Sequence, residues 1–417
     1  MKILTLVYSI GRGGTERAAV NYTVAYKKAG CDSRIWILGE GHDRKSSLEA
    51  HDVTMYFDTD TDHAANKTEI IQWKPDIIHI HTFNDNINKI LLPLKELGCK
   101  IVETNVFSRP RFDEVYKIID VSFQLAYWGF WKYHKWMGYQ EGYPLSLRLP
   151  NLVNSEDFTA VFPQGRTDLR KRLNIPDNAF IAGRIGQAHQ SKWDRKIFDA
   201  VSAVLSKKKD VYFVFVGLPR LLKAEYEHLP AGVKKHIRLI DFIEGDRALT
   251  EFYKSIDVFV HMSKIGESFG FVLAEALLCG CPVVTLSTPF KDNAQFEVVG
   301  DKIGGYCSTS VQDFVKRLLL VYDRKDDFSP DQLYHQIDSR YSEQALVQPL
   351  LKVYRALCDN DRSYLVNLSK STFEVAQKIV DEQMKLYKLK GLFLKMMLEV
   401  LHTPFVFKAI AGLKKKL

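Results

Sequence analysis

The most informative part of this chain reads Gly266-Glu-Ser-Phe-Gly-Phe-Val-Leu-Ala-Glu-Ala-Leu-Leu-Cys-Gly-Cys-Pro-Val-Val284. An apolar run at residues 256–260 comes before it and predicts a buried strand. Ser268 opens an apolar-rich helix that ends at Gly280, and Pro282 begins the next strand. The start of such a helix presents free N–H groups and the positive end of a dipole, so this segment predicts a binding site for phosphate or sugar oxygens.

Two acidic residues in this stretch, Glu267 and Glu275, are separated by seven residues. Glu267 falls in the predicted loop and Glu275 in the first turns of the predicted helix, so both carboxylates can accept hydrogen bonds from hydroxyls of one ligand. A nucleotide sugar needs hydrogen-bond donors for its diphosphate and acceptors for its ribose and hexose hydroxyls. Two carboxylates beside a phosphate-binding helix therefore predict a nucleotide-sugar site.

This spacing resembles the E-x7-E signature of retaining GT-B glycosyltransferases, in particular glycosyltransferase family four. Four further segments are similar to segments of that family: Lys2–Tyr8 with the glycine loop Gly11-Arg-Gly-Gly-Thr-Glu16, Asp76-Ile-Ile-His-Ile-His81, Pro150-Asn-Leu-Val-Asn-Ser-Glu-Asp-Phe158, and Ala182-Gly-Arg-Ile-Gly186 with Lys192. The resemblance covers the chain from residue 1 to residue 358 and leaves the remainder unexplained.

Short apolar strands alternate with amphipathic helices in the first half of the chain, and the same alternation returns in the second half. This pattern predicts an α/β protein with two Rossmann-like, doubly wound domains, each with a parallel sheet covered by helices. The resemblance implies the GT-B fold, in which the two domains face a cleft. We expect an acceptor domain at 1–150, a donor domain at 151–341, a helix at 342–358 that crosses back to the first domain, and a helical basic tail at 359–417.

The resemblance also implies roles for the two carboxylates and the helix start. Glu275 would hold the ribose hydroxyls and Glu267 the transferred sugar. The diphosphate would face the beginning of the helix, which comprises Ser268 and the backbone N–H groups of Phe269, Gly270 and Phe271. In the first domain, Gly13 and Gly14 would let the backbone approach the donor.

Two cations follow the predicted strand near residue 184, and the resemblance implies that they form a phosphate clamp. Charge builds on the β-phosphate when the sugar–phosphate bond breaks, and fixed cations at Arg184 and Lys192 would stabilise that charge most in the transition state. The insert at 187–190 makes their spacing two residues longer than is usual in the family. His189 is therefore an alternative to Lys192.

Histidines in the first domain are candidates for acceptor contact. His79 and His81 alternate on a predicted strand, and we place their side chains on opposite faces, which argues against a shared zinc ion. His81 is nearer the end of the strand and is the better candidate, with a structural histidine as the alternative. Asn105 stands where many family members carry a catalytic-site histidine. Since an amide cannot take a proton, a role as base is lost there.

Other sequence patterns bear on cofactors. Asp58-Thr-Asp60-Thr-Asp62 contains a D-x-D pattern that can hold a metal–diphosphate, but its polar surroundings favour a solvated turn. A dinucleotide-binding glycine motif is disfavoured because Glu16 occupies its third glycine position, where a carboxylate would oppose a pyrophosphate. We therefore expect neither a metal nor another cofactor. Six cysteines without a C-x-x-C pair indicate reduced thiols in a cytoplasm.

The net charge of +8 is concentrated at the C-terminus, where residues 385–417 hold eight lysines and one glutamate, a balance of 8 − 1 = +7. The nearly neutral remainder argues against nucleic-acid binding. From Met384 to Leu401 the charges form one narrow stripe on an otherwise apolar helix, which Pro404 interrupts before it could cross a bilayer. We expect residues 384–417 to lie on an anionic membrane surface, with Phe405, Phe407 and Lys414–Lys416 as anchors. Packing on the first domain or on a second protomer is the alternative.

Together these features lead us to expect a metal-independent retaining glycosyltransferase, cytoplasmic and peripheral on the membrane. By resemblance, it would move a sugar from a UDP- or GDP-linked donor to a growing, lipid-linked glycan such as lipopolysaccharide or capsule. Two alternatives remain at the level of sequence. One is a non-transferring enzyme on the same fold, such as an epimerase or a phosphorylase, and the other is a catalytically silent glycan-binding protein.

Overall fold

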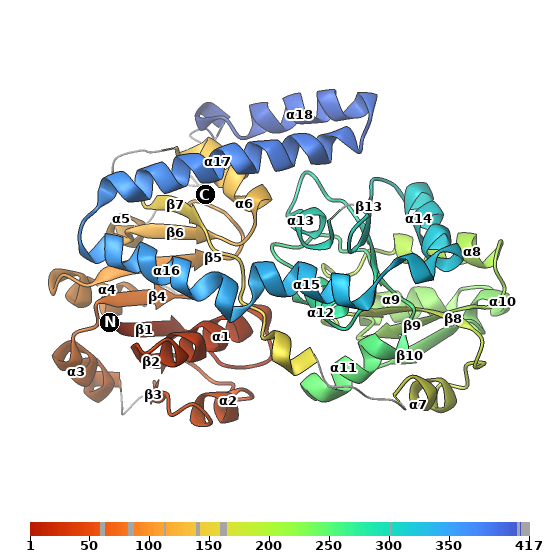
Figure 1. The fold of residues 1–417 in the computed structure, drawn as a ribbon, viewed down its shortest axis with the longest axis horizontal. Coiled ribbons are helices and arrows are strands. Elements are labelled where there is room, and N and C mark those ends of the chain that lie inside the picture. The colour runs from red at the N-terminus through yellow and green to blue at the C-terminus, as the bar shows by residue number, and fades with distance from the viewer. Residues whose placement is uncertain are drawn as a thin grey trace. The chain divides into compact units, whose positions relative to one another are not determined.

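The computed structural model of the chain describes residues 1–58, 63–81, 87–111, 114–138, 142–158, 165–300, 302–406 and 409 (Figure 1). The chain divides into two compact units. Unit 1 comprises Met1–Val153 together with Glu343–Leu417, and unit 2 comprises Asn154–Ser342. Each unit is built around its own parallel sheet.

The sheet of unit 1 has seven parallel strands in the order β3-β2-β1-β4-β5-β6-β7. The strands are β1 (Lys2–Val7), β2 (Asp32–Ile37), β3 (Thr54–Phe57), β4 (Ile77–Ile80), β5 (Lys100–Asn105), β6 (Val121–Gln124) and β7 (Leu145–Arg148). The strand order reverses between β1 and β4. In doubly wound sheets such a reversal is the place where ligands bind, outside the carboxyl ends of the strands.

The helices of unit 1 cover its sheet, except for the last one, which packs on two other helices (Figure 1). They are α1 (Gly14–Lys28), α2 (Lys45–Glu49), α3 (His63–Trp73), α4 (Ile87–Glu96), α5 (Glu114–Ile118), α6 (Tyr127–Met137), α16 (Glu343–Cys358), α17 (Arg362–Lys385) and α18 (Leu389–Leu401). Helix α16 belongs to this unit, since Leu350, Leu351 and Tyr354 join a core cluster with strand residues such as Ile3 and Ile77. No helix within the described residues is long and apolar enough to cross a membrane.

The sheet of unit 2 has six parallel strands in the order β10-β9-β8-β11-β12-β13, which reverses between β8 and β11. The strands are β8 (Phe180–Ile185), β9 (Val211–Val216), β10 (Ile237–Ile240), β11 (Val258–His261), β12 (Val283–Leu286) and β13 (Gly305–Ser308). The helices are η1 (Ser155–Phe158), α7 (Gly165–Arg172), α8 (Lys196–Leu205), α9 (Arg220–Glu227), α10 (Ala231–Lys234), α11 (Gly245–Ser255), α12 (Phe271–Leu278), α13 (Gln295–Val299), α14 (Val311–Asp323), η2 (Lys325–Asp327) and α15 (Pro330–Tyr341).

The two parallel sheets with their covering helices confirm the predicted pair of Rossmann-like domains. The predicted helix over 268–280 is shorter in the structure, where α12 begins at Phe271 and ends at Leu278. Gly270 caps it with a φ of 91°, a left-handed conformation that glycine adopts without steric cost. Ser268 and Phe269 therefore lie in the loop before the helix.

Candidate active site

Polar side chains gather at the carboxyl ends of three neighbouring strands of unit 2. Arg184 lies on β8, His261 ends β11, and Thr285 lies on β12. Strand β11 pairs with β8 on one side and with β12 on the other, and its register places His261 opposite Thr285. This is the point where the strand order reverses, so the fold itself directs these residues to the expected ligand position.

Arg184 is a buried cation with unused hydrogen-bonding capacity. Its residue is 1% exposed, its guanidinium carbon lies 4.3 Å from the centre of the Trp193 ring, and its Nη2 donates to the carbonyl of Lys192 at 2.5 Å. Its Nε and Nη1 have no hydrogen-bond partner among the described residues. Burying such donors without a partner is costly, so a cation placed this way indicates an anionic ligand.

Burial lowers the pKa of Arg184 to about 10, although the negative charges of Glu267 and Asp194 act to raise it. The guanidinium therefore stays charged at neutral pH. A fixed positive charge with two free donors, surrounded by protein instead of water, interacts strongly with a phosphate group.

The carboxylate of Glu267 acts electrostatically on Arg184 and is itself held by several contacts. Its Oε1 accepts from His261 Nε2 at 3.1 Å, its Oε2 pairs with Lys192 Nζ at 3.0 Å, and its backbone N–H donates to Gln295 Oε1 at 3.2 Å. Burial by itself would raise the pKa of Glu267, but the His261 hydrogen bond and the Lys192 charge outweigh burial and lower it to about 2. Glu267 is therefore ionised and fixed in position.

His261 connects this carboxylate to the sheet. Burial, assisted by the charge of Arg184, lowers the pKa of His261 to about 4 in spite of the opposing effect of Glu267. The imidazole is thus neutral at pH 7 and carries one proton. Since a carboxylate can only accept, the proton lies on Nε2, and Nδ1 accepts from the Thr285 hydroxyl at 3.1 Å. Neither His261 nor Thr285 was among the sites expected from the sequence; the available signal was a histidine directly after a buried apolar run.

The loop before α12 is locked against the segment that follows β12. Gly266 has a φ of 73°, and a Cβ there would overlap the carbonyl oxygen of Asp292, so only glycine fits. Ser268 Oγ donates to Asp292 Oδ2 at 2.7 Å, and Gln295 binds the backbone of Glu267 as described above. The loop that carries Glu267 is consequently rigid before any ligand arrives.

The other expected donor residues lie as follows. Glu275 is buried on α12 and accepts a hydrogen bond from the Tyr253 hydroxyl at 2.9 Å. The Phe269 ring packs edge-on against the Tyr341 ring, with 5.1 Å between the ring centres. The side chain is therefore used in packing, and only the backbone of Phe269 remains as a candidate ligand contact. His189 is exposed and its Nδ1 lies 2.6 Å from Ser191 Oγ. Lys192, and not His189, is therefore the residue that joins Arg184 and Glu267 in this structure.

Gly13 and Gly14 of unit 1 lie at the start of α1, with Gly13 as the residue before the helix. The Glu16 carboxylate folds back over Gly13, so a Cβ at that position would overlap it. A carboxylate there interacts favourably with the positive end of the helix dipole.

His79 and His81 lie on the same side of unit 1, and the prediction that they face opposite sides is wrong. Their ring centres are 4.1 Å apart, because side chains two residues apart along a strand point to the same face. His79 is structural: its Nδ1 contacts the hydroxyls of Tyr26 and Tyr354 at 2.8 and 3.0 Å, and its Nε2 contacts Thr104 Oγ1 at 2.9 Å.

His81 differs from His79 in having no such contacts. It is 2% exposed, and neither ring nitrogen has a hydrogen-bond partner within the described ranges. Burial lowers its pKa to about 3, so the ring is neutral. His81 directly follows β4, at the reversal of strand order in unit 1, and its free nitrogens suit a hydroxyl that can donate and accept.

Asn105 serves the backbone of its own loop. Its Nδ2 donates to the Arg109 carbonyl at 2.9 Å, and its Oδ1 accepts from the Arg109 N–H at 3.1 Å. The amide thus closes the turn after β5. Of the D-x-D aspartates only Asp58 falls in the described part of the chain, while Asp60 and Asp62 lie outside it.

Part of the chain matches the model of a known protein family. Residues 165–336 match the family model described as Glycosyl transferases group 1, so unit 2 carries a domain of that group. An alpha-galactosylglucosyldiacylglycerol synthase of Streptococcus pneumoniae is 24% identical over 212 residues, which cover 49% of this chain. The chain spans about half the length of this curated relative, 54% of it.

Solved structures share the fold at low sequence identity. Anabaena Alr3699/HepE, crystallised in complex with UDP, is 18% identical with a TM-score of 0.69, over 85% of this chain and 100% of its own. A glycosyltransferase from Rickettsia africae is 15% identical with a TM-score of 0.69, over 86% and 99%. The pneumococcal O-GlcNAc transferase GtfA, in complex with UDP and GlcNAc, is 10% identical with a TM-score of 0.64, over 85% and 98%. The fold is therefore that of the GT-B glycosyltransferases.

Proposed function

We propose that this protein is a retaining glycosyltransferase that moves a sugar from a UDP- or GDP-linked donor to a growing, lipid-linked glycan. The observation that carries the proposal is Arg184, a buried cation with two donor nitrogens that have no partner among the described residues, beside the ionised and immobilised Glu267. The cation suits the diphosphate of a nucleotide sugar, and the carboxylate beside it suits the hydroxyls of the attached sugar. The group 1 domain and the relatives that bind UDP support the same reading.

In the proposed reaction the guanidinium of Arg184 binds the β-phosphate. The bond between the sugar's anomeric carbon and the phosphate oxygen breaks, and negative charge grows on the phosphate. A fixed cation interacts more strongly with that charge in the transition state than in the bound donor, and this difference accelerates the step. The acceptor hydroxyl attacks from the same face, and its proton passes to the departing phosphate.

Glu267 positions the sugar, and its contacts suggest how the site fills. Its Oε2 is paired with Lys192, whose side chain is 31% exposed. A diphosphate beside Arg184 attracts the Lys192 ammonium away from the carboxylate, and a sugar hydroxyl then takes its place on Oε2. His261 holds Oε1 throughout, so the carboxylate keeps its orientation during the exchange. Glu275 and the backbone at Phe269–Phe271 complete the proposed donor contacts.

We propose the acceptor contact in unit 1 at His81, whose ring nitrogens have no hydrogen-bond partner in the part of the chain that the structure describes and suit a sugar hydroxyl. Asn105 contributes by shaping the loop after β5 and not by taking a proton, since its amide is engaged with Arg109. Within this proposal the protein works at the cytoplasmic face of a membrane, which residues 384–417 contact. The surplus of lysines in that segment supports this location.

A donor screen tests the proposed reaction. We expect one class of UDP- or GDP-sugar to raise the thermal midpoint of unfolding, because a ligand that binds only the folded state stabilises it. The same donor should release its nucleoside diphosphate when a glycan acceptor is added. Stabilisation without release under any acceptor would instead identify a catalytically silent binding protein, and an altered sugar nucleotide without transfer would identify an epimerase.

We also propose that the reaction needs no metal ion, because Arg184, Lys192 and the N–H groups before α12 stabilise the negative charge of the diphosphate. Turnover in excess EDTA should equal turnover in buffer. The measurement is initial rate of nucleoside diphosphate release, with Mn²⁺ added back as a control. A rate abolished by EDTA and restored by Mn²⁺ would shift the diphosphate site to Asp58, Asp60 and Asp62.

A further inference from the structure

Helix α18 is apolar on two opposite faces. Its inner face, with Leu394 at 8% and Leu398 at 0% exposure, packs in a cluster with Trp128 and Trp131 of α6. Its outer face consists of side chains that the described part of the chain leaves exposed: Leu389 at 94%, Leu392 at 71%, Phe393 at 67%, Met396 at 59% and Val400 at 62% exposure. Because successive residues turn by about 100° in a helix, these two sets point in opposite directions.

The exposed apolar side chains of the described residues are concentrated in α18 and just after it, and five of them form the outer face. Of the seventeen large apolar side chains exposed in the described part of the chain, eight fall between residues 389 and 405. The other nine are distributed from residue 8 to residue 375. Single exposed apolar residues are ordinary, but a contiguous group of this kind marks an interaction surface. The alternative expectation, that the tail packs on the first domain, therefore holds for the inner face of α18 and not for its outer face.

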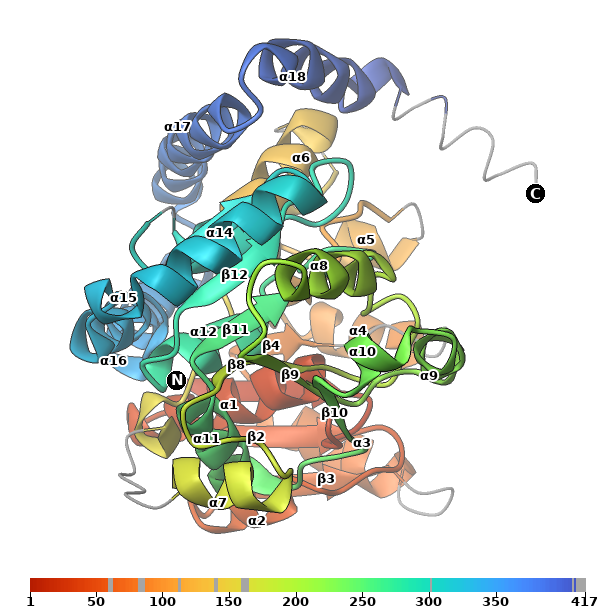
Figure 2. The same cartoon turned by 90° about the vertical axis from the view of Figure 1, so that its right-hand side faces the viewer.

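Helix α18 lies beside α17 and α6 (Figure 2), and specific contacts hold it there. Helix α18 follows α17 through a tight corner, where Lys388 has a φ of 54° and a Cβ on Gly391 would overlap the Met384 carbonyl. Lys395 pairs with Asp381 of α17 at 2.7 Å. Trp136 of α6 donates to the carbonyl that ends α18, Leu401, at 3.2 Å. The surface is therefore part of the folded unit 1 and not a loose terminal peptide.

Three exposed lysines lie at the beginning of this surface. Lys385, Lys388 and Lys390 are exposed where α17 turns into α18. The segment from residue 385 to the end of the sequence carries the balance of +7 described above. A surface that combines apolar side chains with lysines is complementary to the headgroup region of an anionic bilayer.

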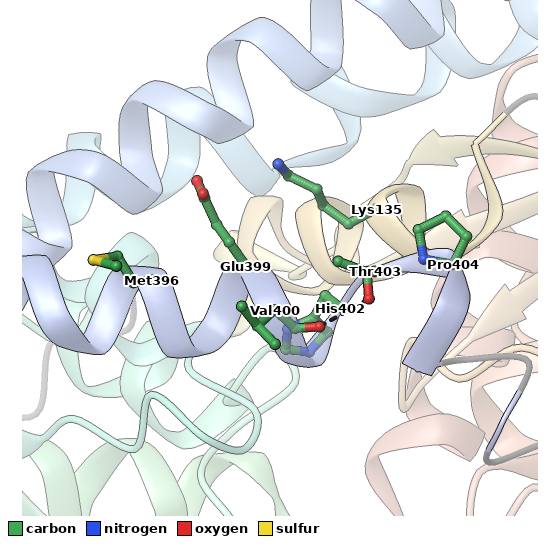
Figure 3. Close-up of a pocket in the computed structure, with 7 residues that line it drawn as sticks. All are labelled: Lys135, Met396, Glu399, Val400, His402, Thr403 and Pro404. Atoms are coloured by element: carbon green, nitrogen blue, oxygen red, sulfur yellow. Dashed lines mark hydrogen bonds between the residues drawn. The ribbon is translucent and has the colours of Figure 1, made fainter.

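A groove continues the outer face at the far end of α18 (Figure 3). Its volume is about 510 Å³. It is lined by Lys135, Met396, Glu399, Val400, His402, Thr403 and Pro404. Met396 and Val400 belong to both the groove and the outer face, and the charged ends of Lys135 and Glu399 extend at its rim (Figure 3). The groove gives the surface a hollow with polar edges beside its apolar side chains.

We propose that the outer face of α18 is a membrane-docking surface that lies in the plane of an anionic phospholipid bilayer. The inference deepens the proposed function, on which it rests for its biological sense, by naming the surface that contacts the membrane. Thirteen residues make a helix of about 20 Å, too short to cross a hydrocarbon core of about 30 Å, so the helix lies flat. A second copy of the chain is a poorer occupant, because pairing would bring two tails of like charge together.

Vesicle sedimentation without donor or acceptor tests the surface independently of catalysis. The probes are vesicles of phosphatidylcholine alone and of phosphatidylcholine with phosphatidylglycerol. We expect the full chain to bind only the anionic vesicles, with affinity falling as salt rises. A variant with Leu392→Gln, Phe393→Gln and Met396→Gln should bind at least about ten-fold more weakly, since each change removes apolar surface from the interface.

Two comparisons make the result specific. A variant with Lys385→Gln, Lys388→Gln and Lys390→Gln should weaken binding and its salt dependence. The matched control, Leu221→Gln with Phe242→Gln, changes exposed apolar residues of unit 2 at 61% and 57% exposure and should bind like the unaltered chain. Unchanged binding by the outer-face variant would overturn the proposal. So would a vesicle-independent dimer that this variant converts to monomer. Donor stabilisation, measured on the same variants, reports separately on the proposed reaction.

Discussion

Replacement of Arg184 by methionine is expected to lower kcat/KM for the donor about 10- to 150-fold, without lowering the free energy of unfolding. A hydrogen bond to a charged group contributes about 1.5–3 kcal/mol, which corresponds to that range of rates. Methionine fills the space against Trp193 but presents no donor to a phosphate. Steady-state kinetics and urea unfolding of the same preparation measure the two quantities.

Stability should be kept or raised because Arg184 destabilises the ligand-free protein. Burial lowers its pKa to about 10, which means that the folded state disfavours the charged form. Two of its nitrogens have no partner among the described residues, so their desolvation is uncompensated until a ligand binds. Functional groups that cost stability in this way are typical of active sites.

Arg238 provides a matched control in the same unit. Its Nε donates to the Leu173 carbonyl at 2.6 Å and its Nη2 to the Asn174 carbonyl at 3.0 Å, so its donors are used within the protein. Arg238→Met should therefore lower the free energy of unfolding and leave donor turnover unchanged, the opposite pattern. Equal turnover by the Arg184 variant and the unaltered chain would remove Arg184 from the proposed donor site.

The second large effect is expected for Glu267→Gln. Glutamine keeps the shape and the bond from His261 but loses the charge that pairs with Lys192 and accepts the sugar hydroxyl. We expect kcat/KM to fall by a similar factor, about 10- to 150-fold, because one charge-assisted hydrogen bond is lost. Initial rates at saturating acceptor, with the donor varied, measure the change.

The same substitution changes stability in a defined pH range. The pKa of Glu267 is lowered from 4.5 to about 2, so its contribution to stability is fully present above pH 4.5 and is lost as the pH falls through 2. The difference corresponds to on the order of 3 kcal/mol at neutral pH. The stability gap between the unaltered chain and the glutamine variant should therefore close between pH 4.5 and pH 2.

This acid range separates Glu267 from the buried histidines. His261, His134 and His402 have their pKa lowered from 6.5 to about 4 by burial, so the stability that they contribute is lost at higher pH, as the pH falls from 6.5 to 4. The effect of His134 and His402 cancels in the comparison, because neither contacts the substituted residue. His261 is different, because Glu267 raises its pKa, and we expect the substitution to lower the pKa of His261 further. A gap that stays constant down to pH 2 would mean that Glu267 is not the stabilised carboxylate described above.

Much of the fold could be predicted from local sequence patterns, because secondary structure depends on residues close together in the sequence. Alternation of apolar strands with amphipathic helices depends on residues a few positions apart, and it predicted two parallel-sheet domains that the structure contains. The Gly266–Val284 stretch likewise located a loop and a helix between two parallel strands, β11 and β12. Helix α12 starts later than predicted because the left-handed Gly270, which caps it, depends on backbone geometry that composition does not reveal.

The prediction of which face of a strand two side chains share was wrong. His79 and His81 were placed on opposite faces, yet a strand returns to the same face every second residue, and their rings are neighbours. The contrast between the two histidines is also tertiary. The His79 ring contacts the hydroxyls of Tyr26 and Tyr354, which come from helices far away in the sequence, whereas the ring nitrogens of His81 have no hydrogen-bond partner in the described ranges.

By itself, the sequence determined the two α/β domains, the charged residues Arg184, Lys192 and Glu267 as candidates for one ligand, and the apolar, basic character of the tail. Tertiary structure alone decided that Lys192 pairs with Glu267 and that His261 and Thr285 support it, because those contacts depend on which strands are neighbours and in what register. It also decided which face of α18 is covered. That helix carries apolar side chains on two opposite faces, and only the position of α6 and α17 distinguishes the packed face from the exposed one.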